Sequence, residues 1–428
     1  MQKIFSKLGP GLITGAADDD PSGIATYSQA GAQFGFNILW TVVFTYPLMV
    51  GIQIVSARIG RVTGAGLAQN IARHYGRPLA IAIVALLFAA NLINVGADIA
   101  AMGEALQLIV GGPEHGHALL FGALCLLLQI KLDYQTYVRY LKWLTLALLA
   151  YVALVFTIDV PWREVVLRAV WPQIPISRDF LMTVVAVFGT TISPYLFFWQ
   201  ATQEVVDMQT ASESPLYARL RRESAALGEV AKKADPAAIE HLRRIKIDTW
   251  IGMGFSNLVA FFIVLSTAAT LHAHGITDIQ TSRQAAEALR PLAGNFAFIL
   301  FALGIIGTGM LAVPVLAGST AYAVTEVFGW KRGLDRKLLE AREFYAIVAV
   351  ATLGGGLLDF TTIDPIRALF WSAIINGVIA VPIMAVMMLL AVRPDVMGRF
   401  TVRPRLRVMG WAATGVMTAA VVAMLLTL

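Results

Sequence analysis

Long apolar segments separated by short polar stretches run along almost the whole chain. Eleven of these segments have the length and composition of membrane-spanning helices, which need roughly 20 mostly apolar residues each. Their predicted limits are 9–35, 37–57, 79–110, 116–131, 141–158, 179–203, 248–271, 295–327, 341–358, 364–392 and 406–427. The pattern therefore predicts an all-α integral membrane protein with 11 transmembrane helices.

Composition supports a membrane protein and argues against several other classes. Hydrophobic residues make up 57% of the 428 positions and charged residues only 14%, whereas about a quarter of a soluble domain is charged. The net charge is +6, and the basic residues lie in the loops between the apolar segments. They therefore indicate how the chain is oriented in the membrane and not nucleic-acid binding. Cys125 is the only cysteine, which excludes a disulfide within the chain. The sequence contains no catalytic triad, phosphate-binding loop or zinc motif, so we expect neither an enzyme nor a bound cofactor.

The Lys and Arg residues of the loops predict how the chain is oriented in the membrane. They cluster at 58–77, 131–142, 331–337 and 393–407, which all fall on one side if the N-terminus is cytoplasmic. An odd number of spans then places the C-terminus outside the cell. The longest loop, 204–247, is also basic and is predicted to be a cytoplasmic linker of one or two helices. The compact chain without long extramembrane tails favours a prokaryotic plasma membrane.

The stretch GAADDDPSG, residues 15–23, places three aspartates inside the first apolar segment. A charge at mid-bilayer costs at least about 2.5–3.5 kcal/mol, so such residues face a cavity and usually mark a pathway. Pro21 removes a backbone donor, and Gly23 relaxes the backbone beside it. We therefore expect a helix that stops, exposes carbonyl groups and restarts, because irregular backbone is tolerated at that depth only where it lines a site.

The sixth apolar segment contains a matching interruption. In FGTTISPYLFFWQATQE, residues 188–204, Thr190 and Ser193 precede Pro194. Interruptions at corresponding positions of two five-span halves point to an inverted-repeat transporter with its site between them. Asp20, freed carbonyl groups and hydroxyls are hard oxygen donors, which suit Mg²⁺, Ca²⁺, Mn²⁺ or a monovalent cation.

Four segments resemble the Nramp family of divalent-metal transporters. GPGLITGAADDDPSG is similar to the first helix of that family, NLINVGADIAAMGEALQLI to its third, FGTTISPYLFFWQ to its sixth and FWSAIINGVIAVP to its tenth. The resemblance covers nearly the whole chain and implies the LeuT-type fold, a 5+5 inverted repeat with broken helices 1 and 6. On this scheme repeat one spans 8–160, repeat two spans 176–393, and an extra helix covers 406–427.

The resemblance also implies which residues bind the metal. Asp20 matches the aspartate of the family motif Asp-Pro-Gly-Asn, Gly23 stands at the position of its asparagine, and Ala17 sits where the family offers a backbone carbonyl. With the sixth-helix positions and the neighbouring acid, the expected metal site consists of Asp20, Ala17, Gly23, Thr190, Ser193, Tyr195 and Asp19.

The sixth-helix motif departs furthest from the family pattern Ala-x-x-Met-Pro-His. Thr190, Ser193 and Tyr195 stand in place of its alanine, methionine and histidine. A hydroxyl lacks the preference of a thioether for transition metals, and Gly23 opens space for an ion that keeps its waters, as Mg²⁺ does. These departures resemble a divergent Nramp-related branch associated with Mg²⁺ transport, so we expect Mg²⁺ uptake that tolerates Mn²⁺. The alternative within the family is a proton-coupled Mn²⁺/Fe²⁺ importer, and Ca²⁺ fits less well because it prefers more oxygen ligands.

The proton route of the usual family members resembles a chain of acids on helix three, a histidine on helix six and an arginine within helix nine. None of the six histidines of this chain falls in a span centre, and Arg342 lies only at the start of span nine. Asp98 matches the first acid, Ala101 replaces the second, and Glu104 lies one turn further on. We therefore expect uptake that is driven by voltage and not by protons. Asp18, Asp98 and Glu104 are the candidate pathway residues, and the alternative for the last two is a polar pair that steadies the bundle.

Two other classes of function fit the same pattern. An amino-acid or organic-solute symporter on the LeuT-type scaffold would use aromatic residues such as Tyr195 and Phe197 as pocket walls. A receptor or scaffold that transports nothing is the third class, against which the paired interruptions argue. We expect the partners to be the transported ion and the lipid bilayer, with no nucleic acid, and the protein to be a monomer.

Overall fold

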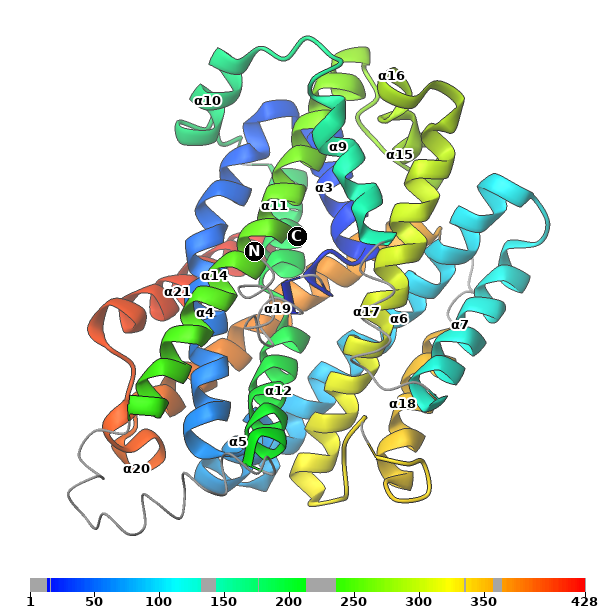
Figure 1. The fold of residues 1–428 in the computed structure, drawn as a ribbon. Helices are drawn as coiled ribbons and strands as arrows, with labels where there is room; N and C mark the ends of the chain where they lie inside the picture. Colours follow the sequence, from blue (N-terminus) through cyan, green and yellow to red (C-terminus); the bar gives the residue numbers. More distant parts are fainter. Residues whose placement is uncertain are drawn as a thin grey trace.

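The computed structural model describes residues 14, 15, 17–131, 144–175, 177–212, 236–334, 336–356 and 364–427. Within these residues all regular structure is helical, and the helices stand side by side in one elongated bundle (Figure 1). The predicted all-α fold class is therefore confirmed.

Within the part of the chain that the structure describes, eleven helices make up most of the bundle. They are α3 (Pro21–Phe34), α4 (Leu39–Thr63), α6 (Arg77–Val110), α7 (Glu114–Lys131), α11 (Arg178–Thr191), α12 (Pro194–Ser212), α14 (Pro236–Thr270), α17 (Ala297–Phe328), α18 (Arg342–Gly356), α19 (Pro365–Ala391) and α21 (Pro404–Leu426). Shorter helices connect them, namely α5 (Leu67–Tyr75), α9 (Leu149–Leu154), α10 (Trp162–Val170), α15 (Ser282–Glu287), α16 (Arg290–Ala293) and α20 (Pro394–Met397), together with 3₁₀ turns that include η2 (Leu144–Leu148) and η7 (Gly398–Phe400).

Seven helical stretches of the described residues are long and apolar enough to cross a membrane. They are 21–63, 77–110, 178–209, 240–274, 297–328, 365–391 and 404–426. The first and third of these each join two consecutive helices, and α7, η2 with α9, and α18 occupy further predicted spans in shorter or less apolar form. The predicted number of 11 spans therefore stays a prediction, and residues 141–143 of the fifth one lie outside the described residues.

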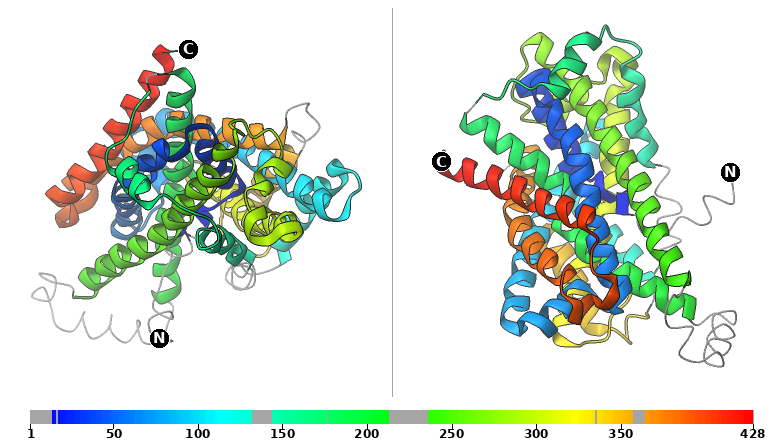
Figure 2. Two further views of the ribbon diagram at one scale, coloured as in Figure 1. Left: turned by 90° about the horizontal axis from the view of Figure 1, so that it is seen from above. Right: turned by 90° about the vertical axis from the view of Figure 1, so that its left-hand side faces the viewer.

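Two helix pairs form the centre of the bundle. Helix α6 packs along α17, and α11 packs along α19, whereas the C-terminal helix α21, drawn in red, lies at the outside of the bundle (Figure 2). The second pair crosses at two glycines, because a Cβ added to Gly189 would lie 2.0 Å from the Ala373 carbonyl oxygen and 2.5 Å from the Gly377 amide nitrogen. Small residues at such a crossing let two backbones approach each other closely, as is typical of membrane helix contacts.

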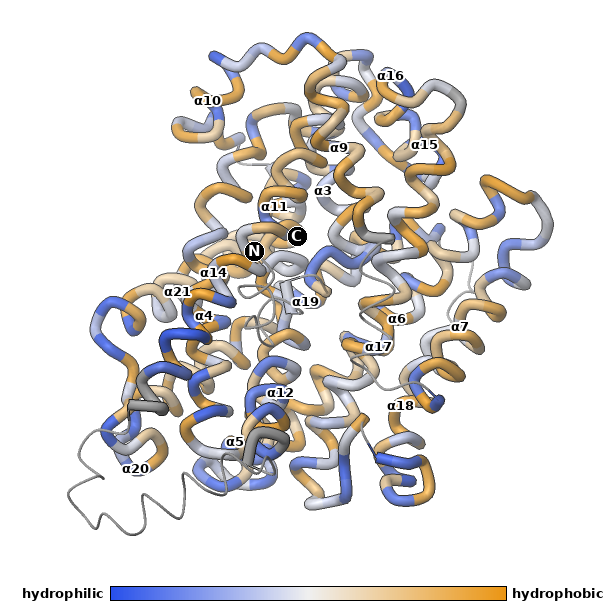
Figure 3. Tube along the Cα trace, in the orientation of Figure 1, coloured by the Kyte–Doolittle hydropathy of each residue, from blue (hydrophilic) through white to orange (hydrophobic). Residues whose placement is uncertain are grey.

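The two ends of the bundle differ in polarity. Helices α5 and α20 lie at one end and α10, α15 and α16 at the other (Figure 1), and hydrophilic residues gather around α5, α12 and α20 (Figure 3). At the same end Glu204 and Asp207 of α12 form ion pairs with Arg61 of α4 and Arg244 of α14, at 2.8 Å for Arg61–Asp207 and 2.9 Å for Arg244–Glu204. This four-residue group, the ionic cluster, ties α12 to both neighbouring helices.

The predicted loop 204–247 is shorter in the structure than in the sequence analysis. Helix α12 continues to Ser212 and α14 already begins at Pro236. Residues 213–235 lie outside the described residues. Helices α12 and α14 therefore extend beyond the apolar segments that predicted them, into polar sequence.

Candidate functional site

The first predicted interruption is present, and Asp20 organises it. Residues 17 and 18 are helical, the chain leaves the helix at Asp19, and α3 restarts at Pro21. Asp20 has an extended backbone with φ −78° and ψ 170°, and its Oδ1 accepts a hydrogen bond of 2.7 Å from the Gly23 amide. Aspartate at the N-cap and proline at the first position are both favoured at a helix start. The carboxylate therefore sits at the positive end of the α3 dipole.

The second predicted interruption lies between α11 and α12. Helix α11 ends at Thr191, and α12 begins at Pro194. The Ser193 hydroxyl donates back to α11, with Oγ at 2.7 Å from the Thr190 carbonyl oxygen and 3.1 Å from that of Gly189. Its hydrogen thus satisfies carbonyl groups that the end of the helix leaves free, while its lone pairs stay available to a cation.

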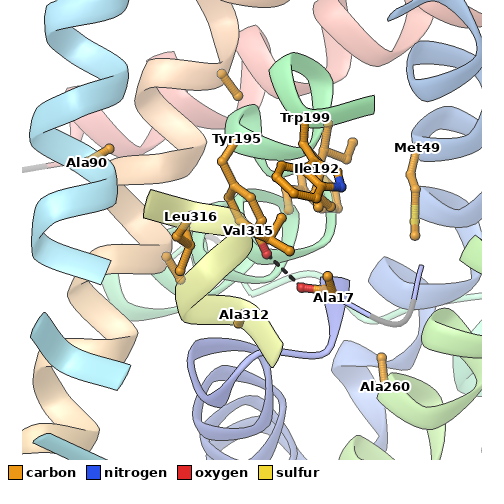
Figure 4. Close-up of a cluster of buried hydrophobic side chains, with 14 of the residues drawn as sticks. Ala17, Met49, Ala90, Ile192, Tyr195, Trp199, Ala260, Ala312, Val315 and Leu316 are labelled. Carbon is orange, nitrogen blue, oxygen red and sulfur yellow. Dashed lines mark hydrogen bonds between the residues drawn. The ribbon is translucent and has the colours of Figure 1, made fainter. Parts of the chain in front are cut away.

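The two interruptions face each other and are joined by a hydrogen bond. The Tyr195 hydroxyl donates to the Ala17 carbonyl oxygen at 3.0 Å (Figure 4). A Cβ added to Gly23 would lie 3.3 Å from the Tyr27 ring, 3.4 Å from Thr190 Oγ1 and 3.5 Å from Asp20 Oδ1. Gly23 therefore lies close to Tyr27, Thr190 and its own cap residue Asp20. The extra room that we expected at this glycine is closed in this conformation by Tyr27 and Thr190.

Asn94 of α6 connects Asp20 to the centre of the bundle. Its amide nitrogen donates to Asp20 Oδ2 at 3.0 Å and to Asp98 Oδ2 at 3.2 Å. Its carbonyl oxygen accepts from Ser372 Oγ at 2.8 Å and from Asn376 Nδ2 at 3.4 Å, both on α19. One side chain therefore holds two carboxylates and links α3, α6 and α19. Sequence reasoning missed Asn94, although its position four residues before Asp98 puts both on one helix face.

Asp18 and Asp19 form a second group with Ser256 of α14. The serine Oγ lies 2.6 Å from Asp18 Oδ2 and 2.9 Å from Asp19 Oδ1. A hydroxyl has only one hydrogen to donate, so it cannot satisfy both carboxylates at once. Asp18 Oδ1 has no hydrogen-bond partner among the described residues. This group can therefore accept a further donor or a cation.

The negative charge at this place is buried and has no basic partner. Asp18, Asp19, Asp20 and Asp98 are between 0% and 4% exposed. Among the described residues no Lys, Arg or His forms an ion pair with any of the four. Buried carboxylates are costly unless a counter-charge or hydrogen bonds offset them. The arrangement therefore favours binding of a cation.

A cation bound here would be coordinated by both side-chain and backbone oxygens. Within the described residues no group of three His, Cys, Asp or Glu side chains is placed to hold one metal ion together. Neutral oxygens would therefore have to complete the shell, and the Ala17 carbonyl and the hydroxyls of Thr190 and Ser193 are the neutral oxygens at the two interruptions. One sulfur is close by, since Met102 Sδ and the ring of Pro21 both pack against Gly309 of α17.

Glu104 lies apart from the aspartates. Its carboxylate accepts hydrogen bonds from the Ser282 backbone amide at 2.9 Å and from the Ser282 hydroxyl at 2.6 Å. Ser282 is the first residue of α15, at the end of the bundle away from the ionic cluster (Figure 1). The structure therefore joins Asp98 to Asn94 and Asp20, and it joins Glu104 to an outer helix.

Comparison with known sequences identifies relatives along most of the chain. Residues 11–427 match the family described as natural resistance-associated macrophage protein-like. A protein of Yersinia enterocolitica named divalent metal cation transporter MntH is 29% identical over 325 residues, which cover 73% of this chain and 71% of the relative. A protein of the same name from Verminephrobacter eiseniae is 27% identical over 386 residues, 85% of this chain and 80% of the relative.

Comparison with solved structures finds the same architecture. The manganese transporter of Eremococcus coleocola, crystallised with an aromatic bis-isothiourea compound, matches with a TM-score of 0.75 at 16% identity, over 98% of this chain and 85% of that one. MhsT in complex with L-phenylalanine matches with a TM-score of 0.59 at 11% identity, over 97% of this chain and 98% of that one. At such low identities the likeness establishes the fold alone, and the predicted LeuT-type fold with two broken helices is confirmed.

We expect substitution of Asn94 by Ala to weaken cation binding. The change removes the donor that orients Asp20 and leaves Asp98 without its partner, and loss of a residue that orients a metal ligand typically lowers affinity about 10- to 100-fold. Isothermal titration of Mn²⁺ and Mg²⁺ into the purified protein measures the effect.

Asn91→Ala is the matched control for this prediction. Asn91 lies one turn away on the same helix, and within the described residues its side chain bonds only to α17, at the Leu316 carbonyl and the hydroxyls of Ser319 and Thr320. Its loss should lower thermal stability and leave affinity unchanged. Equal affinity of the Asn94→Ala variant and the wild type would contradict the role given to Asn94.

Proposed function

The chain belongs to the natural resistance-associated macrophage protein-like family, and we propose on that basis that it transports divalent metal cations across a membrane. The observation that carries the proposal is a set of buried aspartates at the meeting point of two broken helices, with no basic partner among the residues that the structure describes. The names of the bacterial relatives and the manganese transporter of the same fold support a divalent metal as the cargo.

We propose Asp20 as the ligand that supplies charge to the ion. It lies at the first interruption, and its carboxylate is already held by the Gly23 amide and by Asn94. The carbonyl of Ala17 and the hydroxyls of Thr190 and Ser193 would supply neutral oxygens. Three further residues complete the predicted set. Asp19 adds a neighbouring carboxylate, and Gly23 lines the site close to Thr190. Tyr195 contributes through its hydrogen bond to the Ala17 carbonyl.

For Asp18 and Asp98 we propose a pathway role. Both are buried next to the ligand aspartate, and each keeps a carboxylate oxygen without a hydrogen-bond partner among the described residues. For Glu104 the same role would require its carboxylate to leave the Ser282 amide and hydroxyl, from which it accepts hydrogen bonds here.

We propose that the transported ion is Mg²⁺ and that the protein also transports Mn²⁺. The candidate ligands are oxygens, which suit hard cations, and Ser193 supplies a hydroxyl at the position where the family motif has a thioether. Mg²⁺ keeps several of its waters when it binds to proteins, so few protein ligands suffice. The alternative within the family is a Mn²⁺/Fe²⁺ importer, which would use a sulfur ligand. Met102, which packs against Gly309 together with Pro21, would be the candidate for that ligand.

Transport without proton coupling is the mechanism that we propose. The histidines of the described residues lie at helix ends and in turns, and Arg342 is an exposed residue at the start of α18. Neither type of residue is therefore placed to relay protons beside Asp98. A membrane potential supplies about 2.3 kcal/mol per charge per 100 mV, which doubles for a divalent ion, so an inside-negative potential drives uptake by itself.

The setting that we propose is the plasma membrane of a prokaryote. The cytoplasmic side would be the end of the bundle that carries the ionic cluster, α5 and α20, because loop Lys and Arg residues concentrate on that side of bacterial membrane proteins. The N-terminus would then be cytoplasmic and the C-terminus external, and we propose a monomer as the working unit.

Replacement of Asp20 by Asn should abolish most metal transport. The change removes the proposed charged ligand while keeping its shape, and a loss of at least 1.4 kcal/mol of ion binding corresponds to a drop of about tenfold or more. Uptake of Mn²⁺ and Mg²⁺ into proteoliposomes with an internal metal-sensitive dye measures it. Asp179→Asn, an exposed acid at the start of α11, is the control and should transport like the wild type. Full uptake by the Asp20→Asn variant would refute the site.

The proposed cargo preference predicts a selectivity change in the Ser193→Met variant. A thioether binds Mn²⁺ better than Mg²⁺, so the uptake ratio of Mn²⁺ to Mg²⁺ should rise from little discrimination in the wild type by about tenfold, the equivalent of 1.4 kcal/mol. Ser193→Ala, which removes the hydroxyl without adding sulfur, separates this effect from loss of the hydroxyl. Exclusion of Mg²⁺ by the wild type would overturn the proposed cargo.

Uncoupled transport predicts that Mg²⁺ uptake leaves the luminal pH unchanged. Proteoliposomes with a potassium diffusion potential and an internal pH dye should take up Mg²⁺ faster when the interior is negative, with no acidification beyond that of empty liposomes. Acidification in step with metal entry would show that protons move with the ion and would restore the proton-coupled alternative.

A further inference from the structure

A large groove lies away from the aspartates, at the end of the bundle that holds the ionic cluster. Its volume is about 920 Å³. Its walls are the second half of α4, the start of α14, the turn η7 and the start of α21. Beside the groove, helices α4 and α21 are in close contact, since a Cβ added to Gly51 would lie 2.8 Å from Met409 Cβ. We call this space the basic groove.

The charge of the basic groove has one sign. Its lining contains no Asp or Glu and six cationic side chains, which are Arg58, Arg243, Lys246, Arg399, Arg403 and Arg405. Among the described residues no ion pair joins Arg58, Arg243, Lys246, Arg403 or Arg405 to a carboxylate. The neighbouring Arg244, by contrast, is paired with Glu204. The positive charge of these five residues is therefore left for a ligand.

Arg58 is the innermost of these cations. Its side chain is partly buried, one terminal nitrogen donates to the Phe400 carbonyl oxygen at 3.0 Å, and its Nε is buried without a hydrogen-bond partner. Arg403 lines the same groove and carries the same charge. Like charges held together around a buried donor are costly unless an anion joins them.

The rest of the basic groove is apolar and continues into an apolar outer surface. Its lining includes Ile54, Leu242, Trp250, Leu406 and Met409. Next to it Ile247 and Ile251 of α14 are each 47% exposed, and Val408 of α21 is 67% exposed. In a membrane-spanning protein such exposed apolar side chains face lipid. A cationic pocket beside a lipid-facing strip fits an amphiphile better than a free anion.

We propose that the basic groove binds the headgroup of an anionic phospholipid, whose acyl chains lie along α14 and α21. Basic pockets between membrane helices near the cytoplasmic surface are a known type of headgroup site, and each Lys or Arg near an anionic membrane surface strengthens attraction to it. The proposal does not depend on which ion the protein carries.

The basic groove is connected to the aspartate site through two helices. Helix α4 carries Arg58 in the groove, and its Gln53 and Ser56 donate to the carbonyl oxygens of Leu196 and Phe197 on α12, the second half of the broken helix. Helix α14 carries Lys246 in the groove and, about 15 Å further along at 1.5 Å per residue, Ser256 at Asp18 and Asp19. A bound lipid therefore stabilises the helices that position the site.

The triple variant Arg243→Gln/Lys246→Gln/Arg405→Gln tests the proposal. All three side chains are exposed and make no side-chain hydrogen bond within the described residues, so folding does not depend on them. The matched control is Lys331→Gln/Arg336→Gln/Lys337→Gln, which removes the same charge from exposed positions between α17 and α18. Full-length proteins are placed in phosphatidylcholine nanodiscs with and without phosphatidylglycerol or cardiolipin, and lipid retention by native mass spectrometry and thermal stability are measured.

Anionic lipid should raise the melting temperature of the wild type and of the control, and the groove variant should bind it at least about tenfold more weakly. Glycerol phosphate added to phosphatidylcholine discs should have no such effect. Equal loss in the control variant would show general surface attraction, and an equal effect of glycerol phosphate would show a site for a soluble anion. Either result, or unchanged lipid retention by the groove variant, overturns the proposal.

Discussion

A backbone that leaves the helix inside a bilayer must find partners for the N–H and C=O groups that it frees, and this constraint shapes the whole centre of the molecule. The Asp20 carboxylate accepts from the Gly23 amide, the Ser193 hydroxyl donates to the end of α11, and the Tyr195 hydroxyl donates to the Ala17 carbonyl. Each interruption is thus stabilised partly by its own residues and partly by the other interruption. The two broken helices depend on each other for their shape.

The same solution leaves an excess of negative charge. Hydrogen bonds from Asn94 and Ser256 stabilise the aspartates, but no basic side chain of the described residues neutralises them. At the proposed site a transported cation would supply the missing charge, and its attraction to the carboxylates would be strongest where they are least hydrated. Because transport requires release as well as binding, neutral oxygens around one principal carboxylate suit a carrier better than a cage of several acids, which would hold a divalent ion too tightly.

Sequence reasoning predicted the two interruptions because proline next to Asp20 and to Ser193 leaves a local signal in otherwise apolar segments. It missed Asn94 and Ser256, since a single neutral polar residue in an apolar helix has the same pattern whether it packs helices or orients a ligand. It also could not separate Glu104 from Asp98. That distinction depends on Ser282, a residue 178 positions away whose approach only the folded bundle determines.

The ionic cluster has a mechanical consequence for any opening at that end of the bundle. If α12 is to move away from α4 and α14, Arg61 and Arg244 must part from Glu204 and Asp207, whose four ion pairs are 2.8 to 3.7 Å long. Once water enters, hydration replaces most of the lost attraction, and dissolved salt screens what remains. Because Arg61 and Glu204 are at most 8% exposed, salt reaches these ion pairs only after this end of the bundle has opened to water. The pairs therefore hold α12 against α4 and α14 in the arrangement seen here and weaken once water enters.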